Sequence, residues 1–401
     1  MSALELDLGD LGFDEGAHLL VKRALAGVAI GAEVVVRGGA SSLAIDLETW
    51  CRAQGHGWAA AGAGARDGAH VASVRRGRAE AGRWHGATRA GGITPAAIVD
   101  HPPASWGLAP RGATVEAGVA VHDFALAERR LVWADEAPRL YAQAAAAQWD
   151  PATAIPWDAP ADQPAEVEDA IVQLMTYLVE NETAALLVPA RFLGQVHPHF
   201  REVMQLLAIQ VADEARHVEV FARRAALRRD ALGLSTAGGQ ASLATLVREP
   251  DFALASFLLS VLGEGTFLSL LWFIRDHAPD LATREVARLA AQDEARHVAF
   301  GLAHLSRHAG EDAHLRARLA FAVERRHATL AATAGLNEEV FDALVLLAAG
   351  GWEPAAIRRG HAAVRALQRE MDAGRRQRLG RLGFTAGEAE ALSALHTRNF
   401  M

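Results

Sequence analysis

Two copies of one five-residue motif carry the clearest chemical signal in this sequence. The run from Asp213 to His217 reads DEARH, and the same letters recur 80 positions later from Asp293 to His297. In each copy a Glu and a His stand three positions apart, so on a helix both side chains leave the same face. A carboxylate and an imidazole from one helical turn can bind one metal ion. The duplicated motif therefore predicts four of the six ligands of a di-iron carboxylate bundle.

The same ligand pattern requires one further acid from each partner helix. Glu264 precedes the second motif's Glu by 30 positions and lies in the most apolar long stretch of the chain. Glu182 precedes the first motif's Glu by 32 positions, also in apolar surroundings, and is preferred to nearby Glu180 because its spacing matches better. The sequence thus predicts a repeated helical hairpin and six metal ligands, namely Glu182, Glu214, His217, Glu264, Glu294 and His297.

The alternative to a metal site is a pair of core helices joined by salt bridges. That alternative buries two Glu–His pairs and two isolated acids without a cation, which is very costly. We therefore favour the metal site. A third Glu-x-x-His, formed by Glu324 and His327, lies among arginines without an upstream acid in apolar surroundings. We expect it on the solvated surface.

The other charged residues of the duplicated motif have a predicted role beside the ligands. A ligating imidazole usually donates its second N–H to a carboxylate. Asp213 and Asp293 are the nearby candidates, each reaching across to the opposite helix, and Arg216 and Arg296 would then pair with those aspartates. The alternative is that both aspartates lie on the surface.

Long helices must position these residues. Helical periodicity begins near residue 165 and predicts helices over 165–196, 199–230, 250–278 and 280–308, followed by shorter ones over 311–333, 337–348, 353–373 and 385–397. Four helices of about 30 residues make a bundle about 45 Å long. The apolar stretch 252–274 is interrupted by Glu264, so we expect a bundle helix there and not a membrane span.

The first 160 residues have a different character. Residues 1–80 predict a small α+β domain of order β-α-β-α-β-β, with strands over 4–8, 33–36, 58–65 and 70–75 and helices over 19–28 and 42–53. Residues 81–160 are rich in Gly, Pro and Trp, and seven of the nine tryptophans precede residue 160. We expect this connector to pack on the following domain, residues 161–401.

Composition limits the function classes. The 401 residues include one cysteine, Cys51, so a single chain has neither a structural disulfide nor a cysteine-based metal site. The net charge of −8 gives no electrostatic footprint for nucleic acid. No targeting signal is evident, and we expect a soluble, cytoplasmic protein without membrane association. The sequence leaves the oligomeric state open, with a homodimer among the options.

The duplicated DEARH motif resembles the ferritin-like, non-haem di-iron oxygenase superfamily over residues 165–330. The resemblance maps the six acids and histidines above onto the family's ligands and implies two iron ions, with manganese or a mixed Mn/Fe pair as alternatives. It implies an O2-dependent oxidoreductase that hydroxylates, N-oxygenates or desaturates a small organic substrate, using electrons from an external donor. The alternatives are a ferroxidase or iron-binding protein, and a tRNA-modifying hydroxylase, which the net charge opposes.

Three positions depart from members of this superfamily. Phe221 stands where the ribonucleotide reductase subunit has its radical tyrosine, and Leu268 where multicomponent hydroxylases have a threonine. Ala290 replaces the extra histidine of the arylamine N-oxygenases. Four aromatic residues near the acids either line an apolar pocket or pack in the core: Phe192, Phe267, Trp272 and Phe273.

The N-terminal segment resembles the TusA/SirA-like sulfur-carrier domains. The resemblance rests on residues 6–8, 22–25 and 50–56. The family's reactive Cys-Pro-x-Pro motif would fall near Phe13 to Gly16, where this chain has no thiol. A persulfide carrier needs a thiolate, so this domain is expected to lack that chemistry. Cys51 is expected to be a small buried residue on the second helix.

Overall fold

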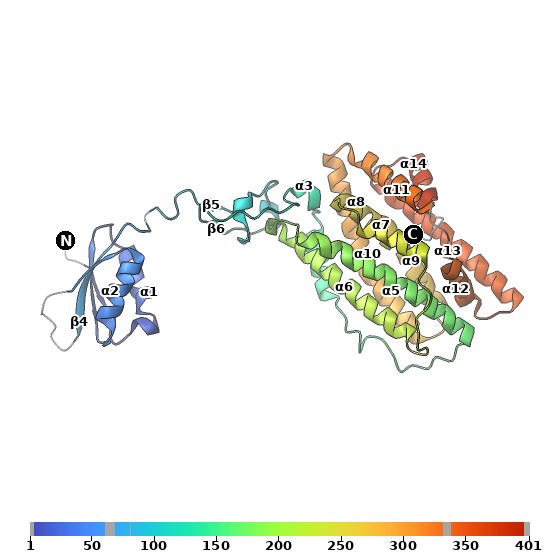
Figure 1. The fold of residues 1–401 in the computed structure, drawn as a ribbon, viewed down its shortest axis with the longest axis horizontal. Coiled ribbons are helices and arrows are strands. Elements are labelled where there is room, and N and C mark those ends of the chain that lie inside the picture. Colours follow the sequence, from blue (N-terminus) through green and yellow to red (C-terminus); the bar gives the residue numbers. More distant parts are fainter. Residues whose placement is uncertain (1–3, 61–68, 81, 332–337, 397–401) are drawn as a thin grey trace. The chain divides into compact units, whose positions relative to one another are not determined.

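A computed structural model describes residues 4–60, 69–80, 82–331 and 338–396, which form two compact units (Figure 1). The first unit contains the residues up to 90 together with 112–120, and the second contains 91–111 and the residues from 121 onward. Part of the Gly/Pro/Trp-rich segment 81–160 therefore groups with each unit. The chain is mostly helical, with a small sheet near the N-terminus.

The first unit is a four-stranded sheet with two helices packed on it. The sheet order is β1-β2-β4-β3, with β1 parallel to β2 and the other pairs antiparallel. The elements are β1 (Leu4–Asp7), α1 (Ala17–Ala26), β2 (Glu33–Gly38), α2 (Leu43–Gln54), β3 (Gly57–Ala60) and β4 (His70–Arg75). This is the predicted element order, and the part of the third strand expected beyond residue 60 lies outside the described residues.

One apolar core joins the sheet and both helices of this unit. Val34 and Val36 alternate with exposed neighbours along β2, as expected for a strand with one buried face. Leu47 and Cys51 of α2 pack in the same cluster, and burial raises the pKa of the Cys51 thiol to about 11. Cys51 is therefore the buried residue that was predicted. A short ribbon of β5 (Thr88–Arg89) and β6 (Thr114–Val115) completes the unit.

The second unit is built on long helices that pack side by side (Figure 1). After the short helices α3 (Arg129–Val132) and α4 (Ala137–Ala146), the bundle consists of α5 (Ala165–Leu193), α6 (Arg201–Ala225), a composite third helix over residues 252–277, and α10 (Leu281–Glu311). Helix α5 packs along α6, and α9 packs along α10, which gives the two predicted hairpins. Helix α10 begins at an N-cap residue, Asp280, whose side chain accepts a hydrogen bond from the Thr283 amide.

The third long helix is not uniform. It comprises α8 (Phe252–Ser256), a π-helical segment η6 (Phe257–Glu264) and α9 (Gly265–His277). The freed carbonyl of Val261 accepts a hydrogen bond from Arg378 Nε at 2.7 Å, and that guanidinium lies against Gly265. A Cβ on Gly265 would come 2.6 Å from Arg378 Cζ. The glycine beside Glu264 thus permits a close approach.

This composite helix is also long and apolar enough to cross a membrane. Its most apolar window has a mean hydropathy of 1.8, yet 78% of that window is buried inside the protein. Among the described residues, a second stretch passes the same test only if α12 and α13, bent by 118°, are taken together. The burial of residues 252–277 is what a core helix of a bundle requires.

Further helices cover the bundle. They are α7 (Ala237–Val247), α11 (Leu315–Ala331), α12 (Glu338–Ala349), α13 (Pro354–Arg381) and α14 (Ala386–His396). Helix α12 packs on α5, α13 packs on α9, and α7 packs on α5 and α11. Helix α7 was not predicted from the sequence. The other four begin within a few residues of their predicted starts, and α13 runs eight residues beyond its predicted end at 373. Residues 332, 333, 337 and 397 of the predicted helices lie outside the described residues.

Candidate metal centre

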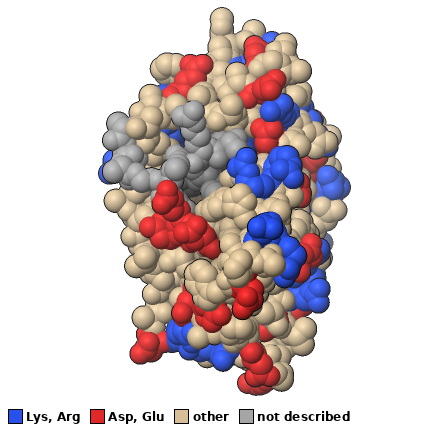
Figure 2. Space-filling model, turned by 90° about the vertical axis from the view of Figure 1, so that its right-hand side faces the viewer, with Lys and Arg blue, Asp and Glu red and all other residues tan. Residues whose placement is uncertain are grey.

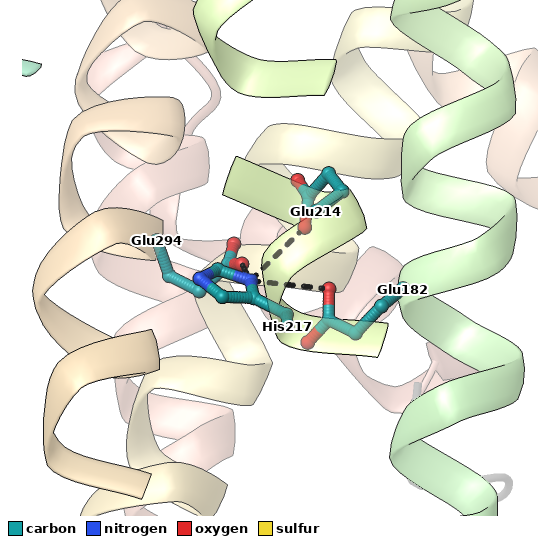
Figure 3. A group of neighbouring side chains, drawn as sticks. All are labelled: Glu182, Glu214, His217 and Glu294. Carbon is teal, nitrogen blue, oxygen red and sulfur yellow. Dashed lines mark hydrogen bonds and ion pairs between the residues drawn. The ribbon is translucent and has the colours of Figure 1, made fainter. Parts of the chain in front are cut away.

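Six acidic and imidazole side chains converge in the middle of the bundle. They come from α5, α6, the last residue of η6 and α10, and all are buried. Two overlapping groups of possible ligand atoms lie within 4.8 Å of one another: Glu182, Glu214, His217 and Glu294 in one, and Glu214, Glu264, Glu294 and His297 in the other. Figure 3 shows the first group, in which three carboxylates surround the His217 ring. Glu214 and Glu294 belong to both groups, as bridging carboxylates would.

The Nδ1 atoms of the two histidines face the carboxylates. His217 Nδ1 lies 3.2 Å from Glu214 Oε2, 3.3 Å from Glu294 Oε1 and 3.8 Å from Glu182 Oε2. His297 Nδ1 lies 3.1 Å from Glu214 Oε1 and 3.4 Å from Glu294 Oε2. Two ligand atoms about 2.1 Å from one octahedral ion lie about 3 Å apart. The spacing therefore suits atoms that share an ion.

The Nε2 atoms point the other way, to aspartates of the opposite motif. His217 Nε2 lies 3.2 Å from Asp293 Oδ2, and His297 Nε2 lies 3.3 Å from Asp213 Oδ2. Both aspartates are buried. A carboxylate at Nε2 fixes the proton on that nitrogen and leaves Nδ1 as a lone-pair donor. Each motif therefore orients the imidazole of the other.

Arginines of the two motifs hold these aspartates. Arg216 donates to Asp213 and, at 3.0 Å, to Asp293, so one guanidinium bridges both motifs. Arg296 donates to Asp293 within its own helix. The aspartates are thus internal partners of the histidines, and the surface alternative does not apply to them.

The buried glutamates differ in the direction of their pKa shifts. Burial raises the pKa of Glu182 well above its ordinary value, and Glu214 and Glu294 raise it further. Burial likewise raises the pKa of Glu264, with Glu294 adding to the effect. Burial acts to raise the pKa of Glu214 as well, but His297 and His217 outweigh it and hold that pKa far below its ordinary value.

The histidines respond to the same charges in the opposite sense. Burial acts to lower the pKa of His217, but the carboxylates of Asp293 and the surrounding glutamates raise it well above the ordinary value. Burial also acts to lower the pKa of His297, and Glu294 and Glu214 reverse the shift. So many buried acids hold protons on both imidazoles when no cation is present, and a metal ion would displace those protons.

Three residues of the site have no counterpart in the sequence-based prediction. Gln210 Nε2 donates to Glu264 Oε1 at 3.0 Å. Gln148 Nε2 donates to Asp213 at 2.9 Å, and Trp149 Nε1 donates to Asp293 at 2.8 Å. Gln210 stands one turn before Glu214 on the same helix face, which is a signal that the sequence offered. Gln148 and Trp149 belong to the segment that was expected to pack on the bundle.

The other residues considered from the sequence lie outside the ligand cluster. Glu180 lies away from the cluster and accepts a hydrogen bond from Gln240, whereas Glu182 is in the cluster. Glu324 is exposed, as predicted for the third Glu-x-x-His. Phe221, in the radical-tyrosine position, packs 6.2 Å from the His217 ring.

The four aromatic residues divide between a cavity and the core. Phe267 lines a cavity beside the acids, and Phe192 lines a different, smaller one. Phe273 is buried in an apolar cluster, and Trp272 packs against the same cluster. Phe267 and Phe192 thus each line a cavity while belonging to an apolar cluster, and core packing is the place of Trp272 and Phe273.

A small enclosed cavity borders three of the acids. It measures about 30 Å³ and is lined by Glu182, Glu264 and Glu294, by the polar residues Asn181 and Arg326, and otherwise by apolar residues: Ala185, Leu243, Leu246, Leu258, Leu259, Gly263 and Phe267. This volume holds little more than one water molecule. A groove of about 390 Å³ is lined by residues of α5 and α7, and Leu243 of α7 lines both the groove and the cavity. The Leu243 side chain therefore lies between the two.

Comparison with known proteins gives limited similarity. No family model and no curated protein matches this sequence. One similar solved structure is a point variant of an R2-like ligand-binding oxidase with an anaerobically reconstituted Mn/Fe cofactor, at 18% identity and a TM-score of 0.44, covering 61% of this chain and 92% of that one. Another is the R2-like ligand-binding oxidase with an aerobically reconstituted metal cofactor after photoconversion, at 18% identity and a TM-score of 0.42, covering 64% and 92%. Because these TM-scores lie below 0.5, no chemistry of this chain is inferred from them.

Proposed function

We propose that this protein is a ferritin-like di-metal oxidoreductase that uses O2 to oxidise a small organic molecule. One observation carries the proposal: four carboxylates and two imidazoles form two overlapping groups that share Glu214 and Glu294. The proposed ligands are the six predicted residues. An oxygen-rich set with two imidazoles suits iron or manganese better than copper or zinc. We propose two iron ions, with manganese or a mixed Mn/Fe pair as alternatives.

The residues fit such a metal pair. Several buried atoms of the cluster have no hydrogen-bond partner among the described residues. They are Glu214 Oε1, Glu264 Oε2, both carboxylate oxygens of Glu294, and His297 Nδ1. Buried polar atoms without partners are rare in proteins and call for an explanation such as an ion. Two divalent ions would offset the charge of four buried carboxylates. The orphaned atoms therefore support a site built for cations.

The chain's own residues then define the reaction environment. Asp213 and Asp293 hold the histidine rings with Nδ1 aimed inward, and Gln210 orients Glu264. Two bound iron ions would supply electrons to O2 and allow transfer of oxygen to, or removal of hydrogen from, a bound substrate. Phe267 and the leucines of the cavity exclude bulk water from that position. A substrate larger than O2 requires Leu243 and α7 to move, which would connect the outer groove to the cavity.

The proposed partners follow from the same site. The substrate is a small organic molecule, and an external donor supplies the electrons. A tRNA substrate is the less favoured choice, because the net charge is −8 and the face in Figure 2 shows basic and acidic side chains interspersed. The first unit, which has no thiol at the expected carrier position, is proposed as a structural or docking module similar to the sulfur-carrier domains.

The test is anaerobic loading with Fe(II) followed by mixing with O2. We expect two iron ions per chain, oxidised rapidly with about one O2 consumed per pair, and no further iron uptake. Optical absorbance after rapid mixing and elemental analysis give both numbers. Continued uptake to many ions per chain would support the ferroxidase or iron-binding alternative, and absence of bound iron would overturn the proposal.

A further inference from the structure

Two buried histidines of α10 take no part in the candidate metal centre. His304 and His308 are 0% and 1% exposed. Among the described residues, none of their four ring nitrogens has a hydrogen-bond partner at normal distance, and the Trp133 backbone is close enough to act on His304. A buried polar group without a partner lowers stability. Two such rings, one turn apart, are therefore not explained by packing alone.

Their surroundings keep both rings neutral. Burial, with a contribution from the neighbouring His308, lowers the pKa of His304 to about 3, and a backbone group of Trp133 acts in the opposite direction. The His304 ring packs 5.1 Å from Phe252, and its centroid is 6.0 Å from that of His308. A neutral imidazole carries one N–H donor and one acceptor nitrogen. Such a ring can take up a proton on one nitrogen and release one from the other.

The outer end of the pair reaches the protein surface. His308 Nε2 lies 3.8 Å from Asp312 Oδ2, whose side chain is 19% exposed. Burial lowers the pKa of His308. The charged groups that also act on it are Asp312 and Asp251, which raise its pKa, and Arg130 and Arg318, which lower it. Asp312 therefore offers a solvent-accessible carboxylate that can take a proton from water and pass it to the outer ring.

The inner end approaches the metal centre along the same face of α10. Gly301 is one turn before His304, and a Cβ there would lie 2.6 Å from Ser260 Cβ and 3.6 Å from Ser256 Oγ. The two serines thus lie against the helix where it has no side chain. A cavity of about 20 Å³ is lined by both serines and by Gln210 together with mainly apolar side chains, among them Phe252 and Phe300, and has room for one water molecule.

This cavity borders the acid that ends the π-helical segment. Gln210 donates to Glu264 Oε1 at 3.0 Å, and the Ser260 hydroxyl is close enough to act on the pKa of Glu264. The polar side chains between Asp312 and Glu264 are thus His308, His304, Ser256, Ser260 and Gln210, and Phe252 and Phe300 pack against His304. A single water can bridge the 6.0 Å between the two imidazole centroids.

We propose that His308, His304, Ser256 and Ser260 form a proton relay from Asp312 to the Glu264 side of the metal centre. The proposal rests on the proposed function, which creates the demand for protons. Reduction of one O2 to H2O2 takes two electrons, here from two Fe(II) that become Fe(III), and two protons. Because the centre is buried, those protons must cross the protein. The relay supplies them without storing charge, since each neutral imidazole gains one proton as it loses another.

Substitution of the relay histidines tests the proposal. His304→Phe and His308→Phe keep an aromatic ring and remove its nitrogens. We expect iron content to stay at two per chain, while Fe(II) oxidation by O2 slows roughly 100-fold, as for loss of a positioned proton carrier. The solvent isotope effect, measured in H2O and D2O, should rise in the variants. Added imidazole should restore the rate of His304→Ala.

Two readouts do not depend on the loaded protein. Metal-free His304→Phe should melt at a higher temperature than wild type, because an unpartnered polar ring has been removed. In metal-free wild type, the 15N shifts of His304 should show a neutral ring averaged between its two tautomers. A ring locked in one tautomer would contradict the relay.

A matched control is His199→Phe, which removes another buried imidazole. His199 Nε2 accepts a hydrogen bond from the Val99 amide at 3.0 Å, so this variant should melt at a lower temperature and oxidise iron at the wild-type rate. Ser256→Ala carries the test if a histidine variant does not fold. Wild-type oxidation rates in His304→Phe, His308→Phe and Ser256→Ala would overturn the relay alone, whereas wild-type protein that binds no iron would overturn the proposed function.

Discussion

Each histidine of the candidate centre is divided between two kinds of partner. Its Nδ1 faces glutamates at 3.1–3.8 Å, and its Nε2 faces one aspartate at 3.2 or 3.3 Å. Only Nε2 has a fixed acceptor for its proton in a metal-bound state, so Nδ1 is left to donate its lone pair. The Glu and Asp residues of the DEARH motif thus leave Nδ1 of each histidine to bind metal and Nε2 to donate its proton to an aspartate.

The two shared glutamates should decide whether metal binds at all. Glu214→Ala combined with Glu294→Ala removes a carboxylate from both ligand groups, so we expect wild type to hold about two iron ions per chain and this variant almost none. Elemental analysis after anaerobic reconstitution measures the difference. Glu324→Ala with His327→Ala removes a Glu-x-x-His outside the cluster and should keep both ions. Full metal retention by the first variant would rule out the assignment.

The Glu264 carboxylate should lower the free energy of unfolding of the metal-free protein and raise that of the metal-loaded protein. Because burial raises its pKa above the ordinary 4.5, the native state binds more protons than the unfolded state above that pH. Metal-free stability should therefore fall as pH rises from 5 to 8, by about 1.4 kcal/mol for each unit of pKa difference. Glu264→Gln cannot ionise and should lose less stability over this range, while binding iron less well.

Denaturant unfolding at several pH values, with and without metal, checks this expectation. The control is Glu180→Gln. Glu180 lies outside the cluster, where it accepts a hydrogen bond from Gln240, so this variant should change neither the pH dependence of stability nor the affinity for iron. If Glu264→Gln destabilises the metal-free and loaded forms equally, Glu264 is an ordinary structural acid.

At the scale of elements, the π-helical segment depends on the contact between two helices. Arg378 of α13 binds the Val261 carbonyl and occupies the space beside Gly265. Gly265→Ala would push the guanidinium away and should lower the free energy of unfolding by about 1–2 kcal/mol, the typical cost of overpacking and a lost hydrogen bond. Gly263→Ala meets only the Leu258 carbonyl at 3.3 Å. That control should be neutral or gain up to about 1 kcal/mol from helix propensity. Urea unfolding distinguishes the two, and equal effects would contradict the packing role of Gly265.

Much of this arrangement was predictable because it rests on helical periodicity. The spacing of Glu and His within a turn placed four ligand candidates on two helix faces, and the apolar surroundings of Glu182 and Glu264 pointed to the other two. The π-helical register was not predictable, since the side chain that bonds its Val261 carbonyl, Arg378, is more than a hundred residues away in sequence. The bonds from Gln148 and Trp149 to the aspartates arise from tertiary packing of an irregular segment, which leaves no periodic pattern.

At the scale of the whole molecule, the first unit has its own core and its own sheet. Its cysteine is buried with a pKa of about 11, so it is almost wholly in the unreactive thiol form at neutral pH. We expect Cys51→Ser to leave iron content and O2 consumption unchanged. Wild-type Cys51 should react with a thiol reagent only after denaturation. A persulfide on Cys51 isolated during turnover would contradict this view.

The crosswise aspartates have a consequence for how such a site can arise. A single hairpin carrying one DEARH motif has a histidine whose proton acceptor lies on another hairpin, so it cannot complete a centre alone. Two identical hairpins related by a two-fold axis could supply each other's missing acceptor, because the aspartate of each copy would then meet the histidine of the other. The 80-residue repeat places that reciprocal geometry within one polypeptide, as fusion of an ancestral homodimer would.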